Sequence, residues 1–174
     1  MIKRIMLATL ALGFSGLVLA QSQAVRDQLF GPTDALKKAA DAVHAKMLGP
    51  DSYEQAMELY KDAGDTLAKG KDINSVKEDL SKADGLFKKS TDAAKLAQVT
   101  FADTLTARSA AEKAEASKYA AKDWGKGEEE LKDAAAQLED GNLNKAQKTV
   151  EDATKYYKSA EAKAVNEKAK AAHK

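Results

Sequence analysis

The sequence has no cysteine, two prolines and one tryptophan among its 174 residues. The lack of cysteine excludes disulfide bonds. Basic and acidic residues nearly balance, at 28 and 27, so the chain lacks the positive excess that a nucleic-acid-binding surface needs. Aromatic residues account for only 6% of the chain, whereas alanine fills 35 positions. This composition predicts helices that approach each other closely around a thin core.

Residues 1–20 have the anatomy of a secretory signal peptide. Lys3 and Arg4 precede an apolar run that ends at Leu19, and small residues form a cleavage site at Ala20. The alternative is a retained membrane anchor, because the run is about as long as the shortest membrane spans. The well-formed site favours cleavage after Ala20, and no cysteine follows the run to carry a lipid. We therefore expect a soluble periplasmic product without stable membrane insertion.

The remaining chain contains an internal repeat. Residues 60–70 match residues 131–141 at a shift of 71 positions, and a shift of 70 holds beyond these segments. The aligned aromatic pairs are Tyr53 with Trp124 and Phe87 with Tyr157. A repeat of this kind marks duplicated helical units that bury their apolar faces on each other.

Apolar residues recur at spacings of three and four, which predicts amphipathic helices and no strand. The expected helices cover residues 33–48, 52–69, 73–97, 106–119, 123–140 and 143–165. Gly49-Pro50, Gly70 and Gly141 are expected to end helices. The expected amino-terminal caps are Thr33 or Asp34, Asp51 or Ser52, Asp72 or Asn74, and Asp123.

The predicted fold is all-α, an elongated array of two tandem three-helix units made of antiparallel hairpins. Residues 21–32 are expected to form a flexible lead-in, residues 33–103 the first unit and residues 104–165 the second. Residues 166–174 are expected to form a flexible tail, because the apolar pattern ends there.

One long helix is expected to join the two units. No helix-breaking residue stands between Gly85 and Gly125, so the helix that begins at residue 73 is predicted to continue to about Tyr119. Such a helix would be roughly 70 Å long at about 1.5 Å per residue. The alternative is a kink within residues 100–106, where threonines are frequent.

No catalytic, metal-binding or cofactor-binding pattern is found, and the chain is predicted not to be an enzyme. His44 and His173 are the only imidazoles, whereas a zinc site needs three or four convergent ligands. The acidic runs at residues 128–130 and 139–140 lack the spacing of a calcium-binding loop. We expect both runs on solvated helix faces.

Four aromatic residues are candidates for partner contact: Tyr53, Tyr60, Trp124 and Tyr156. Large rings can fill gaps between alanine-lined helices, and packing is the favoured interpretation for most of the set. The alternative is a groove that contacts a peptide or a glycan. Trp124 and Tyr156 are the strongest candidates for contact, because the adjacent Tyr156 and Tyr157 cannot both face one core.

Two resemblances concern the segment around Gly141. Residues 141–146, with Ala153 seven positions further on, resemble the turn and second helix of a tetratricopeptide repeat. That repeat's usual bulky pair is replaced here by Ala134 and Gln137, and its terminal proline is missing. Its peptide-binding groove is therefore not carried over to this chain.

A closer resemblance is to an uncharacterised alanine-rich helical domain of bacterial envelope proteins, often found ahead of OmpA-like domains. It covers residues 104–165 and, more loosely, residues 33–97. The matching motifs are Lys118-Tyr119-Ala120, Leu138-Glu139-Asp140-Gly141, and the regularly spaced Ala146, Ala153 and Ala160. This chain departs from the pattern in having neither a lipidated cysteine nor an OmpA-like domain. The resemblance implies no catalytic residues.

Together these features predict an exported, non-enzymatic helical-repeat protein that acts as a periplasmic scaffold or adaptor for another envelope protein. No nucleic acid and no cofactor is expected. The alternative is a periplasmic carrier or chaperone that holds apolar ligands or unfolded chains between alanine-lined helices.

Overall fold

The computed structural model describes residues 14–172, so that residues 1–13 of the predicted signal peptide and residues 173–174 of the predicted tail lie outside the description. Over residues 14–172 the chain forms eight helices and no strand, which confirms the all-α prediction. No helix of this part is long and apolar enough to cross a membrane. The helices are α1 (Phe14–Ala42), α2 (Ala45–Leu48), α3 (Pro50–Ala68), α4 (Ile73–Thr100), α5 (Ala102–Lys113), α6 (Ala116–Tyr119), α7 (Ala121–Glu139) and α8 (Leu143–Ala172).

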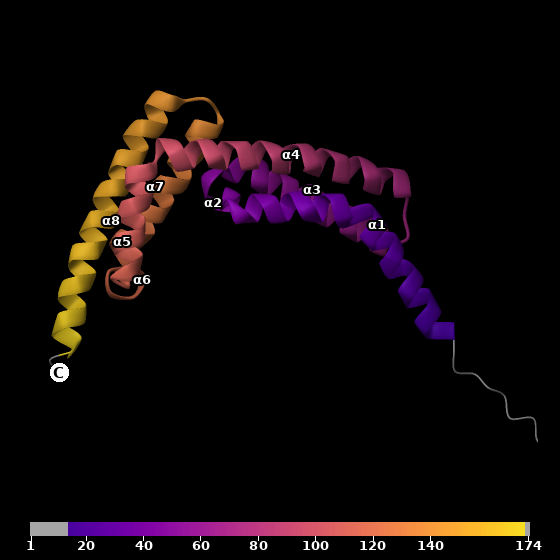
Figure 1. Cartoon of the computed structure of the whole chain (residues 1–174), viewed down its shortest axis with the longest axis horizontal. Helices are drawn as coiled ribbons and strands as arrows, with labels where there is room; N and C mark the ends of the chain where they lie inside the picture. Colours follow the sequence, from indigo (N-terminus) through magenta and orange to yellow (C-terminus); the bar gives the residue numbers. More distant parts are fainter. Residues whose placement is uncertain (1–13, 173–174) are drawn as a thin grey trace, which may run out of the picture.

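The eight helices form two arms that meet in an elbow (Figure 1). The first arm comprises α1 to α4, and the second comprises α5 to α8. In the first arm, α4 packs against both α1 and α3, and in the second arm α8 packs in the same way against α5 and α7. The arms meet where α2, α3 and α4 contact α7.

The repeat is visible in the backbone of both arms. His44 and Glu115, 71 positions apart, both adopt the left-handed conformation, with φ of 57° and 62°. Gly70 and Gly141 occupy the left-handed turns between the last two helices of each arm. The left-handed residue divides the predicted first helix of each unit into a longer helix and a one-turn helix. Each arm therefore has four helices, where the sequence predicts three.

The predicted flexible lead-in at residues 21–32 is wrong, because α1 begins at Phe14 and contains Pro32. The predicted caps Thr33 and Asp34 lie inside this helix. Phe30 and Thr33 are buried, and the packing of this turn maintains the helix although proline removes one backbone hydrogen bond. Figure 1 shows the first part of α1 inclined to the second, as is typical of a proline inside a helix.

The predicted continuous helix from residue 73 to residue 119 is also wrong. The chain leaves helical geometry at Phe101, where φ is −110° and ψ is 23°, and α5 takes a new direction (Figure 1). The alternative of a kink within residues 100–106 is confirmed. No local breaker is responsible; the buried Phe101 and Thr104 side chains hold α5 against α8 instead. Tertiary packing here overrides local helix propensity.

The helix ends follow the prediction only in part. The Asp72 side chain caps α4 by accepting a 2.9 Å hydrogen bond from the amide of Asn74, as expected. The expected caps Asp51, Ser52 and Asp123 are wrong, because α3 begins at Pro50 and α7 begins at Ala121, and neither has a side-chain cap from its own first turn. The expected flexible tail is helical as far as Ala172.

Alanines and a few rings form the core. In the first arm, Tyr53 meets Phe87 edge to face at 5.8 Å between ring centroids. The equivalent pair in the second arm, Trp124 and Tyr157, meets at 5.6 Å. Edge-to-face contacts of this kind stabilise aromatic pairs beyond the effect of burial alone. The aligned aromatics of the repeat are therefore core contacts in both arms. Fully buried alanines on α3, α4, α7 and α8 bring these helices close together; they include Ala56, Ala63, Ala83, Ala94, Ala134, Ala153 and Ala160.

Candidate functional site at the elbow

The elbow is held by a carboxylate that crosses from one arm to the other. Glu139, the last residue of α7, accepts hydrogen bonds from the backbone amides of Asp51 and Ser52 in the first turn of α3, at 3.1 and 3.0 Å. Its side chain is only 1% exposed. A helix begins with amides that have no partner within the helix, and a negative charge at this end is favoured by the helix dipole. Glu139 therefore serves as the cap that α3 lacks locally.

The chain around Gly49 brings these amides to the second arm. Gly49 lies against α4 so closely that a Cβ atom added to it would be 2.5 Å from the backbone oxygen of Ser90. Pro50 then begins α3, at a position where the missing N–H costs no hydrogen bond. A residue with a side chain at position 49 would push the start of α3 away from α4 and thus change the direction in which the amides point.

Further charges surround the Glu139 contact. Lys132 on α7 pairs with Glu54 on α3 at 2.7 Å, and Lys89 on α4 lies 3.9 Å from the Glu139 carboxylate. Burial, together with the nearby charge of Glu139, raises the pKa of Asp51. The contact between the arms thus combines a buried carboxylate with an exposed ion pair. The buried carboxylate is the stronger determinant, because exposed pairs contribute little.

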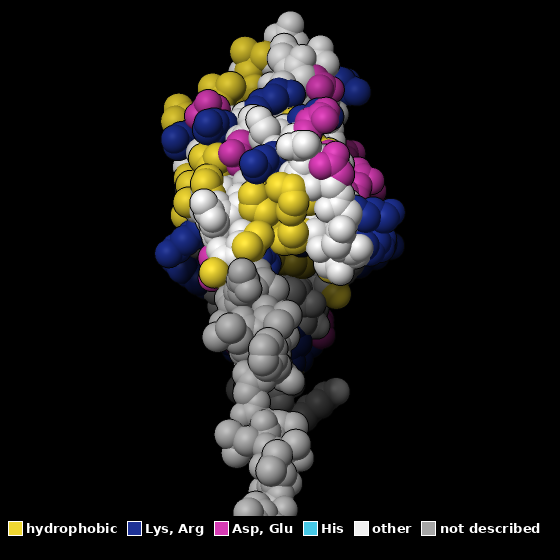
Figure 2. Space-filling view, turned by 90° about the vertical axis from the view of Figure 1, so that its right-hand side faces the viewer, with side chains coloured by type: hydrophobic (Ala, Val, Ile, Leu, Met, Phe, Trp, Pro, Cys, Tyr) yellow, Lys and Arg dark blue, Asp and Glu magenta, His cyan; other side chains and the backbone are white. Residues whose placement is uncertain are grey.

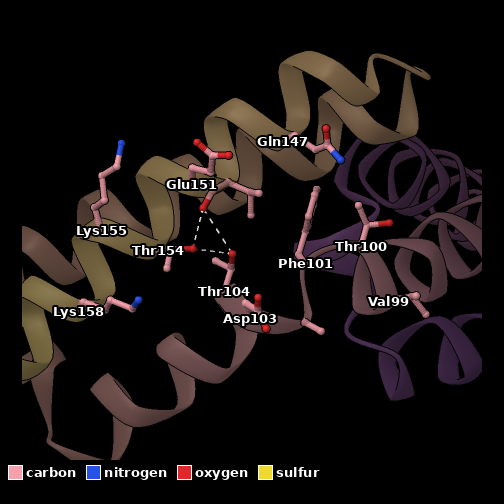
Figure 3. Close-up of a pocket in the computed structure, with 12 residues that line it drawn as sticks. Val99, Thr100, Phe101, Asp103, Thr104, Gln147, Glu151, Thr154, Lys155 and Lys158 are labelled. Carbon is pink, nitrogen blue, oxygen red and sulfur yellow. Dashed lines mark hydrogen bonds between the residues drawn. The ribbon is translucent and has the colours of Figure 1, made fainter.

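A groove of about 760 Å³ lies beside the elbow, between the junction of α4 with α5 and the face of α8 (Figure 3). Phe101, Thr104 and Val150 form its buried floor. Thr104 and Thr154 face each other across this floor with hydroxyl oxygens 2.7 Å apart, and Thr154 donates a 2.9 Å hydrogen bond to the carbonyl of Val150 (Figure 3). The rim carries charges of both signs: Asp103, Glu151, Lys155 and Lys158.

The interior of the second arm contains a polar network. Arg108 on α5 donates two hydrogen bonds to the carboxylate of Glu128, at 2.7 and 3.0 Å, and the Tyr157 hydroxyl donates a third at 2.6 Å. The Arg108 guanidinium also lies 5.2 Å from the centre of the Trp124 ring. Burial and the adjacent Glu128 carboxylate raise the pKa of Tyr157 well above its ordinary value. These partners satisfy one another, and the network therefore stabilises the packing of α5, α7 and α8.

Gly127 makes room for this network. A Cβ atom added to it would lie 2.7 Å from Cε1 of Tyr157, so the ring packs directly on the backbone of α7. Gly125 lies two residues earlier on the same helix, and a Cβ atom added to it would meet no other atom within 4 Å. The two glycines near the start of α7 therefore have different roles.

The four candidate contact residues lie in different surroundings. Tyr53 is buried, and its hydroxyl donates to Asp41 at 2.5 Å. Tyr60 is half-buried and donates to Asp34, also at 2.5 Å. Trp124 is half-buried in the network described above. Tyr156 is also half-buried, and the Lys126 ammonium lies 5.1 Å from the centre of its ring. The structure does not bring the four residues together at one site.

The acidic runs differ from the prediction of solvated faces. Glu128 is half-buried against Arg108, and the side chain of Glu139 is almost fully buried at the elbow. Within residues 14–172, no cluster of histidine and acidic side chains has the arrangement of a metal site. His44 lies at an exposed left-handed turn, and His173 is outside the described residues.

Sequence reasoning missed Phe101 and Thr104 in the groove and Glu139 at the elbow. For the first two a signal is present: Phe30 and Thr33 recur as Phe101 and Thr104 at the repeat shift of 71. All four of these side chains are buried. Glu139 has no such signal, because its counterpart in the first arm is Ala68.

Comparisons with known proteins do not narrow the function. The chain matches no protein-family model, and neither the curated proteins nor the solved structures include a match to it.

Proposed function

We propose that this protein is an exported, non-enzymatic scaffold or adaptor that holds another envelope protein in the periplasm. The single observation that carries the proposal is the elbow, in which the buried Glu139 caps a helix of the opposite arm. A contact made by a buried carboxylate and two backbone amides fixes the direction of the arms more firmly than exposed ion pairs do. Two arms in a fixed relation present separate surfaces to partners.

The surface chemistry supports a role in protein contact. Figure 2 shows basic and acidic side chains intermingled with hydrophobic ones on the face that lies to the right in Figure 1. A mixed surface of this kind lacks the single-sign field that attracts nucleic acid. Periplasmic location rests on the predicted signal peptide and on the resemblance to envelope-protein domains.

Crosslinking in intact cells tests the proposal. The protein should fractionate with the periplasm, and a photo-activatable residue placed along either arm should yield a discrete adduct with one envelope protein. The yield of this adduct should fall in the Glu139→Ala variant, in which the elbow is loosened. The yield should be unchanged in the Glu129→Gln variant, which alters an exposed residue of the same helix. A monomeric protein without any adduct from positions on both arms would contradict the scaffold role.

A second candidate function is a carrier for apolar ligands, and the groove beside the elbow is the observation that favours it. Its floor is formed by Phe101 and Val150, and Val99 on its rim is exposed. A hydrophobic dye should then bind at a single site, and replacement of Val150 by a larger residue should weaken this binding. Absence of dye binding would remove this candidate and leave the scaffold unaffected.

A further inference from the structure

The groove between α5 and α8 has a floor that the first arm also contains. At the repeat shift of 71, Phe101 and Thr104 correspond to Phe30 and Thr33 in α1. All four side chains are buried. The floor of the groove therefore belongs to the packing that the two arms share.

The backbone and the charges around this floor belong to the second arm alone. Phe30 lies inside the helix α1, whereas the chain leaves helical geometry at Phe101. Three of the four charged residues on the rim, Asp103, Glu151 and Lys155, have uncharged counterparts in the first arm, which are Pro32, Ser81 and Gly85. The packing of the helices thus does not require these charges.

Two charges of opposite sign line the groove without a partner. Asp103 comes from α5 and Lys158 from α8, and both also line a smaller hollow that continues the groove away from the elbow. In the part of the chain that the structure describes, neither side chain forms an ion pair, with the other or elsewhere. Lys155, the other base of the rim, already pairs with Asp152 at 2.6 Å. One acid and one base are therefore left for a ligand.

The floor beside these charges offers a hydrogen-bond acceptor. Thr154 donates its hydroxyl proton to the carbonyl of Val150, so Thr104 is the donor in the 2.7 Å hydrogen bond between the two threonines. The oxygen of Thr104 then keeps its lone pairs for another donor. Phe101 lies on one side of the threonine pair and Lys158 on the other (Figure 3). An ammonium or amide N–H above the floor would find an acceptor there.

The composition of the groove selects a class of ligand. Two acids and two bases line it, so it has no field of a single sign, and a further acid, Glu161, borders only the smaller hollow. Eight of its twelve lining residues are polar, which disfavours a long acyl chain. Its volume of about 760 Å³ is in the range of small-ligand sites. A short peptide combines two charged ends with N–H donors and an apolar side chain.

We infer that the groove binds a short peptide with free termini and an apolar side chain. The amino terminus lies against Asp103 and the oxygen of Thr104, and the carboxylate pairs with Lys158. The apolar side chain packs on Phe101 and Val150. This inference rests on the second candidate function, the carrier, and names the class of its ligand.

Titration with the dipeptide leucyl-leucine, followed in nitrogen–proton correlation spectra, tests the inference. The dipeptide should shift the amide signals of Thr104 and Thr154 in a saturable manner. Its N-acetylated form and its carboxyl-terminal amide should each bind at least about threefold more weakly, as expected for loss of an ion pair at a partly exposed site. These capped forms test both charges without any change to the protein.

Two variants assign the two charges to residues. In Asp103→Asn the free and the N-acetylated dipeptide should bind equally, and in Lys158→Gln the free dipeptide and its amide should bind equally. The matched controls are Asp62→Asn on α3 and Lys88→Gln, which changes the counterpart of Lys158 on α4. Both control residues are exposed, and both controls should keep the full effect of each cap.

Two results would overturn the inference. The first is no saturable shift with leucyl-leucine. The second is a pair of cap effects that are absent from the native protein or that persist in Asp103→Asn and Lys158→Gln. In either case a hydrophobic dye that binds in the groove would preserve the carrier function, and envelope adducts formed from the arms would preserve the scaffold role, so the proposals fail separately.

Discussion

The carboxylate of Glu139 accepts a 3.0 Å hydrogen bond from the backbone amide of Ser52, a residue 87 positions earlier in the chain. The same carboxylate also binds the amide of Asp51. A residue at the end of one helix thus completes the beginning of another, and the two helices belong to different arms. This relationship joins the stability of α3 to the position of α7.

Replacement of Glu139 by alanine is expected to lower the free energy of unfolding by about 1–3 kcal/mol, because two amides at a buried helix start lose their acceptor. Glu139→Gln should cost less, since the amide oxygen can still accept one hydrogen bond. Urea unfolding followed by circular dichroism measures both variants. The control Glu129→Gln should lie within about 0.5 kcal/mol of the native protein. Equal stability of Glu139→Ala and the control would contradict the role of the buried carboxylate.

The two glycines near the start of α7 should respond in opposite directions to alanine. Gly127→Ala forces a Cβ atom against the Tyr157 ring and should destabilise the protein by about 1–3 kcal/mol. Gly125→Ala adds a Cβ atom in open space and should stabilise the helix by about 0.5–1 kcal/mol. Thermal unfolding compares the pair. Similar shifts in Tm for both variants would show that Tyr157 does not pack on the backbone of α7.

Tyr157 should make stability decline at alkaline pH. Its folded pKa is raised, so above about pH 10 the unfolded chain loses the phenol proton while the folded protein retains it. The free energy contributed by this difference is fully present below pH 10 and is lost as pH rises. In Tyr157→Phe, the free energy of unfolding should therefore fall less steeply between pH 9 and pH 11. Parallel pH profiles of the two proteins would contradict the raised pKa.

The left-handed turn at His44 should be improved by glycine. A residue with a Cβ atom is strained at a φ of 57°, and the His44 side chain is exposed and makes no cap hydrogen bond. His44→Gly is expected to raise the free energy of unfolding by about 0.5–1 kcal/mol, the relief of strain exceeding the added entropy of the unfolded chain. His44→Ala keeps the Cβ atom and should bring no gain. If chemical denaturation gives His44→Ala a free energy of unfolding equal to or higher than that of His44→Gly, the expectation is refuted.

The sequence alone predicts the helical content, the duplication and the turns at Gly70 and Gly141, because these depend on local spacing and on backbone freedom. It gives the break at Phe101 only as the less favoured alternative, because the break follows from the packing of α5 on α8 rather than from a local breaker. The left-handed positions His44 and Glu115 are hidden for a related reason. Neither is a glycine, so the shared backbone geometry becomes evident only when both arms are compared.

The elbow is the part of the candidate site that the sequence predicts least well. Glu139 stands beside Asp140 and Gly141 and has the local appearance of a solvated acid near a helix end. Its partners are backbone amides, which carry no sequence signature, and its counterpart in the repeat is an alanine. A contact between units that differs from one copy to the next cannot be inferred from the similarity of the copies.

The most direct test of the account is the distribution of distances between the two arms. The protein has no cysteine, so spin labels can be placed selectively at Lys71→Cys, in the turn between α3 and α4, and at Lys113→Cys, at the end of α5. Both residues are exposed and lie at the ends of the arms that are distant from the elbow (Figure 1). Double electron–electron resonance should give one narrow distance distribution for the labelled protein and a clearly broader one when Glu139→Ala is added. A broad distribution in the presence of Glu139, or a narrow one that is unchanged by its removal, would contradict the claim that this carboxylate fixes the elbow.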